Sequence, residues 1–182
     1  MALTYTPKGE LGSSMPSFEL PDLKGSIWNS NQIDQAPAKV IMFICGHCPY
    51  VQAIEERLVQ LGKDLNAKGI PVVGICSNDG DEYPEDSPEA LLKRSEELNY
   101  SFPYLIDATQ EVAKNFDAVC TPDFFVYDKE NRLAYRGRLD DSWKEPSKVK
   151  TEELKTATLG IAKGENLTTE QIPSMGCSIK WK

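Results

Sequence analysis

Two runs of consecutive apolar residues mark the first half of the chain. They are residues 40–44 (Val-Ile-Met-Phe-Ile) and residues 70–76 (Ile-Pro-Val-Val-Gly-Ile-Cys). Runs of this length are typical of strands that are covered on both faces. Shorter strands are predicted further along, and the last two of them form a hairpin: 104–107, 124–127 and 133–135.

Helical periodicity follows the first apolar run. Apolar residues recur at spacings of three and four between Val51 and Leu65, which predicts one amphipathic helix. Gly69 is expected to end it. Another helix is predicted from Ser87, because Ser-Pro-Glu supplies an N-cap, a first-turn proline and an acid. Two further helices are expected at 109–116 and 151–163.

The order of these elements predicts the fold class. Strands that alternate with helices and then close with a hairpin and a helix indicate an α/β fold, with a central mixed sheet flanked by helices. Apolar residues around a turn at 21–25 predict an additional N-terminal β-hairpin. We therefore expect an N-terminal coil at 1–15, one domain at 16–164 and a polar C-terminal tail at 165–182.

Length and charge exclude several classes of protein. The 182 residues suffice for one domain with a proper core, and 28 acidic against 20 basic residues give a net charge of −8. This balance argues against a nucleic-acid binder, which needs Lys and Arg to neutralise phosphates. No apolar run reaches the roughly 18 residues of a membrane helix, and the first residues do not form a signal peptide. A reducing, cytoplasmic location is expected.

The cysteines are the most informative residues. Five of them are scattered along the chain, an odd number that makes a poor disulfide framework. Cys45-Gly46-His47-Cys48 stands where a buried strand is predicted to turn into a helix. This context favours a redox dithiol. Two alternatives to the redox dithiol are metal binding and inert packing. Metal binding is disfavoured because structural zinc normally needs four ligands, and the motif supplies only one half of such a site.

A cysteine at the start of a helix faces unpaired N–H groups, which favour the thiolate. Such placements bring the pKa of a cysteine from about 8.5 to roughly 3.5–7.5. Cys45 is expected to be the more exposed and attacking sulfur, and Cys48 the resolving one. His47 is the only histidine in the chain. A protonated His47 would stabilise the Cys45 thiolate and make the pair more oxidising. The alternative interpretation is that His47 is an ordinary surface residue.

A second motif, Val119-Cys120-Thr121-Pro122, precedes the strand at 124–127. Together with the strand, Cys-Gly-His-Cys and helix, it resembles the thioredoxin-like superfamily, and residues 16–143 resemble its peroxiredoxin-like (AhpC/TSA) branch. The resemblance implies a thioredoxin-like fold for the domain at 16–164. It also implies a cis Pro122 opposite the cysteine pair, with Thr121 presenting its backbone to an extended substrate chain.

The chain departs from the peroxiredoxin pattern next to the reactive cysteine. Peroxiredoxins carry Thr or Ser three residues before it, and Met42 occupies that position here. Efficient peroxidase activity is therefore not expected. Thioredoxins often also keep a buried Asp in the preceding strand, and residues 40–44 contain none. Glu55 or Glu56 are the possible replacements.

The other cysteines and charges are open to two interpretations each. Cys120 either relays oxidation near Cys45 or packs, and Cys177 either folds back as a resolving or regulatory thiol or anchors the tail. Cys76 is expected to pack as a small hydrophobic residue. The acidic segment 79–89 is interpreted as a solvated loop or as a surface that favours docking of basic partners, and the two arginines of 136–138 as a solvated edge or an anion site.

The sequence therefore predicts a thiol-disulfide oxidoreductase of redox homeostasis. Cys45, Cys48 and His47 are its catalytic residues, Thr121 and Pro122 bind substrate, and no cofactor or metal is required. The expected partners are thiol- or disulfide-containing proteins or small thiols. The alternatives are a thiol peroxidase that uses Cys45 and a non-enzymatic metal-binding module that uses the two cysteines with His47.

Overall fold

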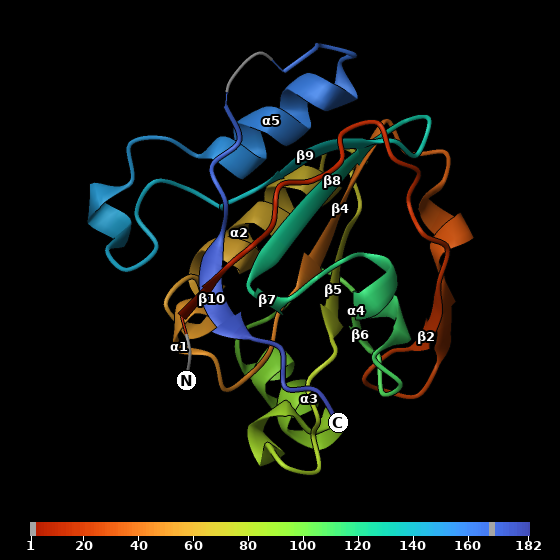
Figure 1. The fold of residues 1–182 in the computed structure, drawn as a ribbon, viewed down its shortest axis with the longest axis vertical. Helices are drawn as coiled ribbons and strands as arrows, with labels where there is room; N and C mark the ends of the chain where they lie inside the picture. The colour runs from red at the N-terminus through yellow and green to blue at the C-terminus, as the bar shows by residue number, and fades with distance from the viewer. Residues whose placement is uncertain (1–2, 168–169) are drawn as a thin grey trace.

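A mixed five-stranded sheet forms the centre of the computed structural model, which describes residues 3–167 and 170–182. Its strand order is β6-β5-β4-β8-β9 (Figure 1). The strands are β4 (Ala38–Phe43), β5 (Val72–Cys76), β6 (Tyr104–Ile106), β8 (Asp123–Asp128) and β9 (Leu133–Gly137). β4, β5 and β6 pair in parallel, whereas β8 pairs antiparallel with both of its neighbours, β4 and β9. The predicted mixed sheet is confirmed.

Helices cover both faces of this sheet. They are α1 (Pro49–Gln52), α2 (Glu55–Asn66), α3 (Pro88–Glu97), α4 (Glu111–Asn115) and α5 (Glu153–Ala162), with short 3-10 turns η1 (Ser30–Ile33), η2 (Pro84–Asp86) and η3 (Pro146–Lys148). All six residues of β4 are buried, and successive side chains point to opposite faces. Val40 and Met42 join one core with α2 and α5, while Ile41 and Phe43 join the other with α4.

The helix predicted between Val51 and Leu65 is interrupted, so this prediction is wrong in one respect. Ile54 leaves helical geometry with φ −114° and ψ −2°, which separates α1 from α2. The Arg57 guanidinium donates a hydrogen bond to the Ala53 carbonyl at the break, 3.4 Å away. The apolar stripe spans both helices and conceals this break in the sequence pattern.

Other local predictions are confirmed. Ser87 caps α3, and its hydroxyl accepts a hydrogen bond from the Ala90 N–H at 3.3 Å. The additional N-terminal hairpin consists of β2 (Glu19–Pro21) and β3 (Ile27–Asn29), which pair antiparallel. In the described part of the chain, no helix has the length and apolar character needed to cross a membrane.

The terminal segments form a second sheet, in the order β1-β10-β7. Its strands are β1 (Leu3–Tyr5), β10 (Met175–Ser178) and β7 (Cys120–Thr121), so the first and last parts of the chain lie side by side (Figure 1). The expected coil at 1–15 and polar tail at 165–182 are therefore not irregular throughout, although residues 1–2 and 168–169 lie outside the described residues. The strands of this second sheet are too short to show an alternating hydrophobic pattern in the sequence.

Candidate redox site

The Cys-Gly-His-Cys motif lies directly after the central strand. β4 ends at Phe43, and Cys48 is the N-cap residue of α1, with an extended backbone at φ −75° and ψ 118°. The motif is therefore at a strand-to-helix turn, as predicted. Because α1 has only four residues, it supplies free backbone N–H groups rather than the dipole of a long helix.

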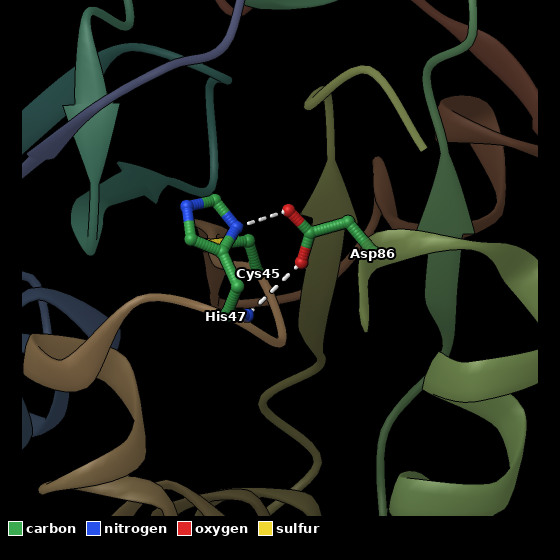
Figure 2. A group of neighbouring side chains, drawn as sticks. All are labelled: Cys45, His47 and Asp86. Atoms are coloured by element: carbon green, nitrogen blue, oxygen red, sulfur yellow. Dashed lines mark hydrogen bonds and ion pairs between the residues drawn. The ribbon is translucent and has the colours of Figure 1, made fainter. Parts of the chain in front are cut away.

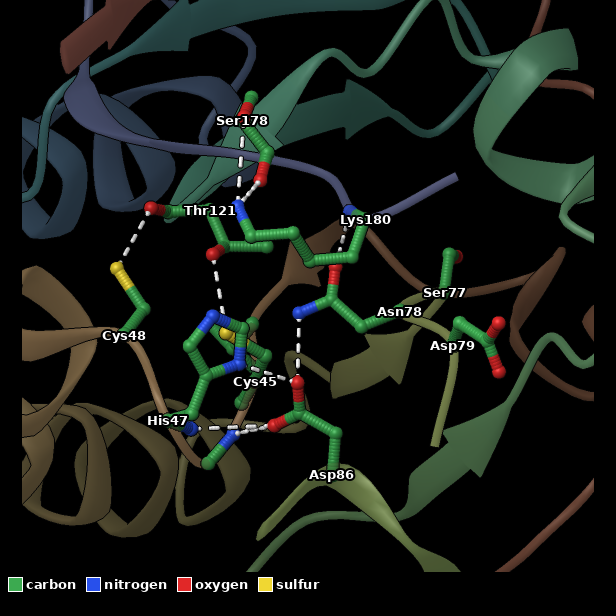
Figure 3. A network of polar contacts seen from close by, with 12 residues as sticks. Cys45, His47, Cys48, Ser77, Asn78, Asp79, Asp86, Thr121, Ser178 and Lys180 are labelled. Carbon is green, nitrogen blue, oxygen red and sulfur yellow. Dashed lines mark hydrogen bonds and ion pairs between the residues drawn. The ribbon is translucent and has the colours of Figure 1, made fainter. Parts of the chain in front are cut away.

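Thr121 contacts the sulfur atoms of both Cys45 and Cys48, the pair that we call the dithiol. The Cys45 Sγ is 3.1 Å from the Thr121 hydroxyl oxygen, and the Cys48 thiol donates to the Thr121 carbonyl oxygen at 3.2 Å (Figure 3). The peptide bond between Thr121 and Pro122 is cis, as the resemblance implies. Thr121 thus contacts the dithiol through its side chain as well as its backbone.

The dithiol is buried. Cys45 is 2% and Cys48 0% exposed, so the expectation that Cys45 is the exposed sulfur is wrong. The reason is that the second sheet covers this end of the molecule, since β10 pairs with β7 at Thr121. All five cysteines are reduced and buried.

The two thiols titrate as a pair. The hydrogen bond from Cys45 lowers the pKa of Cys48 to about 5, while burial, followed by the same hydrogen bond, raises the pKa of Cys45 well above its ordinary value. Because the two groups share one hydrogen bond, the low pKa belongs to the pair rather than to one sulfur. The pair therefore loses its first proton more easily than an ordinary cysteine does.

Asp86 fixes the loop between the two cysteines. Its carboxylate accepts a hydrogen bond from the Gly46 N–H at 2.6 Å. It also accepts from the His47 N–H at 3.1 Å and from the His47 Nδ1 at 2.5 Å (Figure 2). The His47 ring also stacks on Tyr83, with 4.9 Å between ring centroids. Asp86 is 2% exposed, so its assignment to a solvated loop is wrong.

The negative charge of Asp86 opposes the effect expected of His47. After burial and the Cys48 hydrogen bond, this charge is the next cause that raises the pKa of Cys45. An imidazolium paired with a carboxylate adds no net charge near the thiol. The geometry therefore makes His47 less of an activator than the sequence alone predicts.

A hydrogen-bond network connects this loop to the C-terminal segment. The Asn78 side chain donates to Asp86 at 2.8 Å and accepts from the Lys180 N–H at 2.8 Å (Figure 3). The Lys180 carbonyl in turn accepts from the Asp79 N–H at 3.1 Å and from the Gln110 side chain at 2.7 Å. The segment that follows β10 is therefore tied to the partner of His47.

One group of side chains has ligand atoms close enough to hold a metal ion. Within the described residues, single ligand atoms of Cys45, His47 and Asp86 all lie within 4.8 Å of one another. The metal-binding alternative drawn from the sequence named Cys48 in place of Asp86. The structure brings a different trio together, with sulfur, nitrogen and oxygen ligands.

Of the two auxiliary cysteines, Cys177 contacts the dithiol. It is buried in β10 opposite Thr121, and its side chain is hydrogen-bonded to that of Cys48. Burial, and then this hydrogen bond, raise the pKa of Cys177 to about 12. Cys120 is also buried; burial raises its pKa to about 12, followed by the charge of nearby Asp123.

The charged candidates are used in structural ion pairs. Arg136 is 5% exposed and pairs with buried Asp123 at 2.8 Å, so the expected solvated edge is wrong at this position. Glu55 accepts hydrogen bonds from Arg94 at 2.6 Å and from the Tyr100 hydroxyl at 3.0 Å. These partners occupy Glu55, one of the two carboxylates that the sequence offers in place of the buried Asp of thioredoxins.

A mostly apolar groove lies next to the cis proline. Its lining includes Tyr5, Tyr50, Pro122, Trp143 and Met175. Tyr50 follows Cys48 by two residues and contacts Trp143, with 4.5 Å between ring centroids. The groove thus extends from the cis proline across both termini of the chain.

Comparison with known proteins gives a family and several structural relatives. A model of the AhpC/TSA family matches residues 11–136. A search among curated proteins found no match.

Two solved structures resemble the whole chain. An uncharacterised conserved protein from Geobacillus kaustophilus is 43% identical, with a TM-score of 0.94 over 100% of this chain and 97% of that one. A hypothetical protein from Sinorhizobium meliloti 1021 is 39% identical, with a TM-score of 0.94 over 98% of both chains. A secreted disulfide oxidoreductase from Mycobacterium tuberculosis, 18% identical, has a TM-score of 0.61 over 79% of this chain and 95% of that one. This last likeness shows the thioredoxin-like fold.

Proposed function

The chain belongs to the AhpC/TSA family, and we propose that it is a thiol-disulfide oxidoreductase of redox homeostasis that works through its dithiol. The observation that supports this most is the arrangement of both sulfurs around Thr121, at 3.1 Å from its hydroxyl and 3.2 Å from its carbonyl oxygen. The lowered pKa within the pair adds to it, because a thiolate is the form that attacks disulfides.

The proposed reaction needs only the two sulfurs. Cys45 attacks one sulfur of a substrate disulfide as a thiolate and forms a mixed disulfide, and the substrate's other sulfur leaves as a thiol. Cys48 then attacks Cys45, which releases the second substrate thiol and closes a Cys45–Cys48 disulfide. Two electrons and two protons pass from the dithiol to the substrate. His47 and Asp86 position the loop between the cysteines.

The groove supports a polypeptide as the partner. Its aromatic lining suits apolar side chains, and Pro122 places it next to the dithiol. A protein cysteine with apolar neighbours matches these features better than a small charged thiol does. Tyr5 and Trp143, which are 59% and 38% exposed, are available for such contacts.

The second candidate is a thiol peroxidase. The observation that favours it is the Thr121 hydroxyl next to the Cys45 sulfur, since it supplies a hydroxyl that the sequence around Met42 lacks. Peroxide reduction would require Cys45 alone to attack, with Cys48 acting afterwards. Measuring peroxide consumption separates the two candidates.

Insulin reduction driven by dithiothreitol tests the proposal. We expect catalysis by the unaltered protein and its loss in both Cys45→Ser and Cys48→Ser, because resolution needs the second sulfur. Cys76→Ser is the matched control, since this buried cysteine lies outside the dithiol. Full activity in Cys48→Ser would refute the dithiol mechanism, and rapid peroxide consumption by that same variant would favour the peroxidase.

A further inference from the structure

β10 occupies the place where an extended partner chain would pair. It runs antiparallel to β7, with Cys177 opposite Thr121 and Ser178 opposite Cys120. Thr121 is the residue that precedes the cis proline and holds the dithiol. The chain thus supplies its own extended strand, and that strand carries a cysteine, at the backbone position expected to receive a substrate.

Gly176 allows this strand to approach closely. A Cβ atom at residue 176 would lie 1.9 Å from the Thr121 carbonyl oxygen and 3.0 Å from the Pro122 ring. No side chain other than hydrogen fits at such distances. Because residue 176 is a glycine, β10 can lie against Thr121 and bring the neighbouring Cys177 close to the dithiol.

The thiols then form a continuous series. Cys45, Cys48 and Cys177 are buried in the same core cluster. Cys45 and Cys48 contact Thr121, and Cys177 pairs with it across β7 and β10. Cys48 is thus the thiol whose titration both other thiols influence. Cys120, in β7, is also buried. The charge of Asp123 raises the pKa of its thiol, and the charge of Arg136 lowers it.

We propose that β10 is an internal substrate strand and that Cys177 is a third redox cysteine, which exchanges with Cys48. This inference rests on the proposed dithiol function. The Cys177 sulfur attacks Cys48 in the Cys45–Cys48 disulfide, so the S–S bond to Cys45 breaks and a Cys48–Cys177 bond forms. The proton of Cys177 passes to the released Cys45 sulfur. No net oxidation occurs, because one disulfide replaces another.

The exchange has a structural consequence for the site. A Cys48–Cys177 disulfide fastens β10 over the dithiol and keeps Cys45 as a thiol. In the reduced protein β10 is held by strand pairing and by packing of Cys177 in the core, without a covalent bond, and a partner strand can compete for Thr121. The third cysteine therefore gives the oxidised protein a closed form, from which a new substrate is excluded until the bond is reduced.

Disulfide mapping of a Cys45→Ser variant tests this proposal. This variant retains four cysteines, since the chain has five. After treatment with glutathione disulfide, we expect the free thiols to fall from four to two and mass spectrometry to find a peptide linked through Cys48 and Cys177. A second variant, Cys45→Ala, tests whether the result depends on the serine. Circular dichroism verifies that both variants fold.

The results distinguish failure of this proposal from failure of the dithiol function. If the unaltered protein forms the Cys45–Cys48 bond but the folded variants never link Cys48 to Cys177, the third cysteine is refuted and the dithiol stands. If the variants form this link while the unaltered protein never joins Cys45 to Cys48, the dithiol function fails instead. A link from Cys48 to Cys120 would also overturn the assignment of Cys177.

Gly176→Ala provides a second measurement. The added methyl group displaces β10, so we expect loss of the Cys48–Cys177 bond and faster alkylation of Cys48, with the Cys45–Cys48 bond still forming. Lys182→Ala, an exposed change at the end of the same segment, is the control. Unchanged alkylation in folded Gly176→Ala would show that β10 does not shield the dithiol.

Discussion

At the scale of single residues, Asp86 changes the chemistry expected of the Cys-Gly-His-Cys motif. It binds both the backbone and the ring of His47, and its charge raises the pKa of Cys45 after burial and the Cys48 hydrogen bond have done so. A carboxylate at this position stabilises the thiol over the thiolate. We therefore expect a residue outside the motif to influence the reduction potential of the proposed dithiol.

Replacing Asp86 by Asn should make the dithiol more oxidising. The amide oxygen can still accept a backbone hydrogen bond, but the negative charge is gone, so the thiolate of the reduced form is stabilised. We expect the reduction potential to rise by roughly tens of millivolts, because about 30 mV corresponds to 1.4 kcal/mol for this couple. Equilibration with glutathione measures it, and exposed Asp81→Asn is the control. A fall in potential would contradict this role of Asp86.

The lowered pKa of Cys48 predicts that the thiolate of the dithiol forms at an unusually low pH. The pKa of Cys48 is lowered to about 5 by the hydrogen bond from Cys45, so the thiolate is present above that pH and lost below it. An ordinary cysteine ionises near pH 8.5. The ultraviolet absorbance of the thiolate should therefore rise around pH 5 in the unaltered protein. We expect Cys45→Ser to shift this rise to higher pH, and an unshifted rise would show that the hydrogen bond does not lower it.

Much of the site was predictable at this scale, and Asp86 was not. The cysteine pair is recognisable from its spacing and flanking elements, whereas Pro122 is recognised through the resemblance to thioredoxin-like proteins. Asp86 lies among exposed acids such as Asp81 and Glu85, so composition alone indicates a solvated segment. The only usable clue was its place directly before Ser87, whose helix cap fixes the end of this loop.

At the scale of elements, the α3 cap fixes the segment that carries Asp86. The Ser87 hydroxyl accepts from the Ala90 N–H, so its loss leaves that donor without its cap. Ser87→Ala should reduce the free energy of unfolding by about 1 kcal/mol. Urea denaturation measures this change, with exposed Lys93→Ala as the control. An unchanged midpoint would mean that the cap contributes nothing to stability.

The pairing of β8 with β9 contains a buried ion pair that the sequence pattern did not reveal. Arg136 and Asp123 are 5% and 0% exposed. Arg136→Met should destabilise the protein by about 3–5 kcal/mol, because it leaves the carboxylate buried without its cation. Urea denaturation tests this, and Arg132→Met, at a more exposed position on the same hairpin, is expected to cost much less. Equal losses in both variants would argue against this role of the buried pair.

At the scale of the whole molecule, the sequence predicts the central sheet better than the sheet at the chain ends. The apolar runs of β4 and β5 are visible locally, and each pairs with a neighbour of the same core. β1 and β10 have three and four residues, and their partners are far away in the sequence. Such pairings depend on the finished fold, so no local pattern indicates them.

The two termini should also stabilise each other. The Thr6 N–H donates to the Ser174 carbonyl at 3.0 Å, and the Ser174 N–H donates to the Thr6 hydroxyl at 2.9 Å. Removal of residues 1–6 should therefore speed hydrogen exchange of the amides at 175–178. Amides of β8, which is buried in the central sheet, serve as the internal control. Unchanged exchange at 175–178 would show that β1 is not needed to hold β10.

Cys177 is synthesised after the dithiol that β10 covers. Residues 45–48 and 121–122 leave the ribosome before Cys177 does, because translation proceeds from the N-terminus. In the finished fold β10 pairs with β7 at Thr121, and Cys45 and Cys48 are buried. We therefore expect the dithiol of a nascent chain to be alkylated faster before residues 175–178 are made than after.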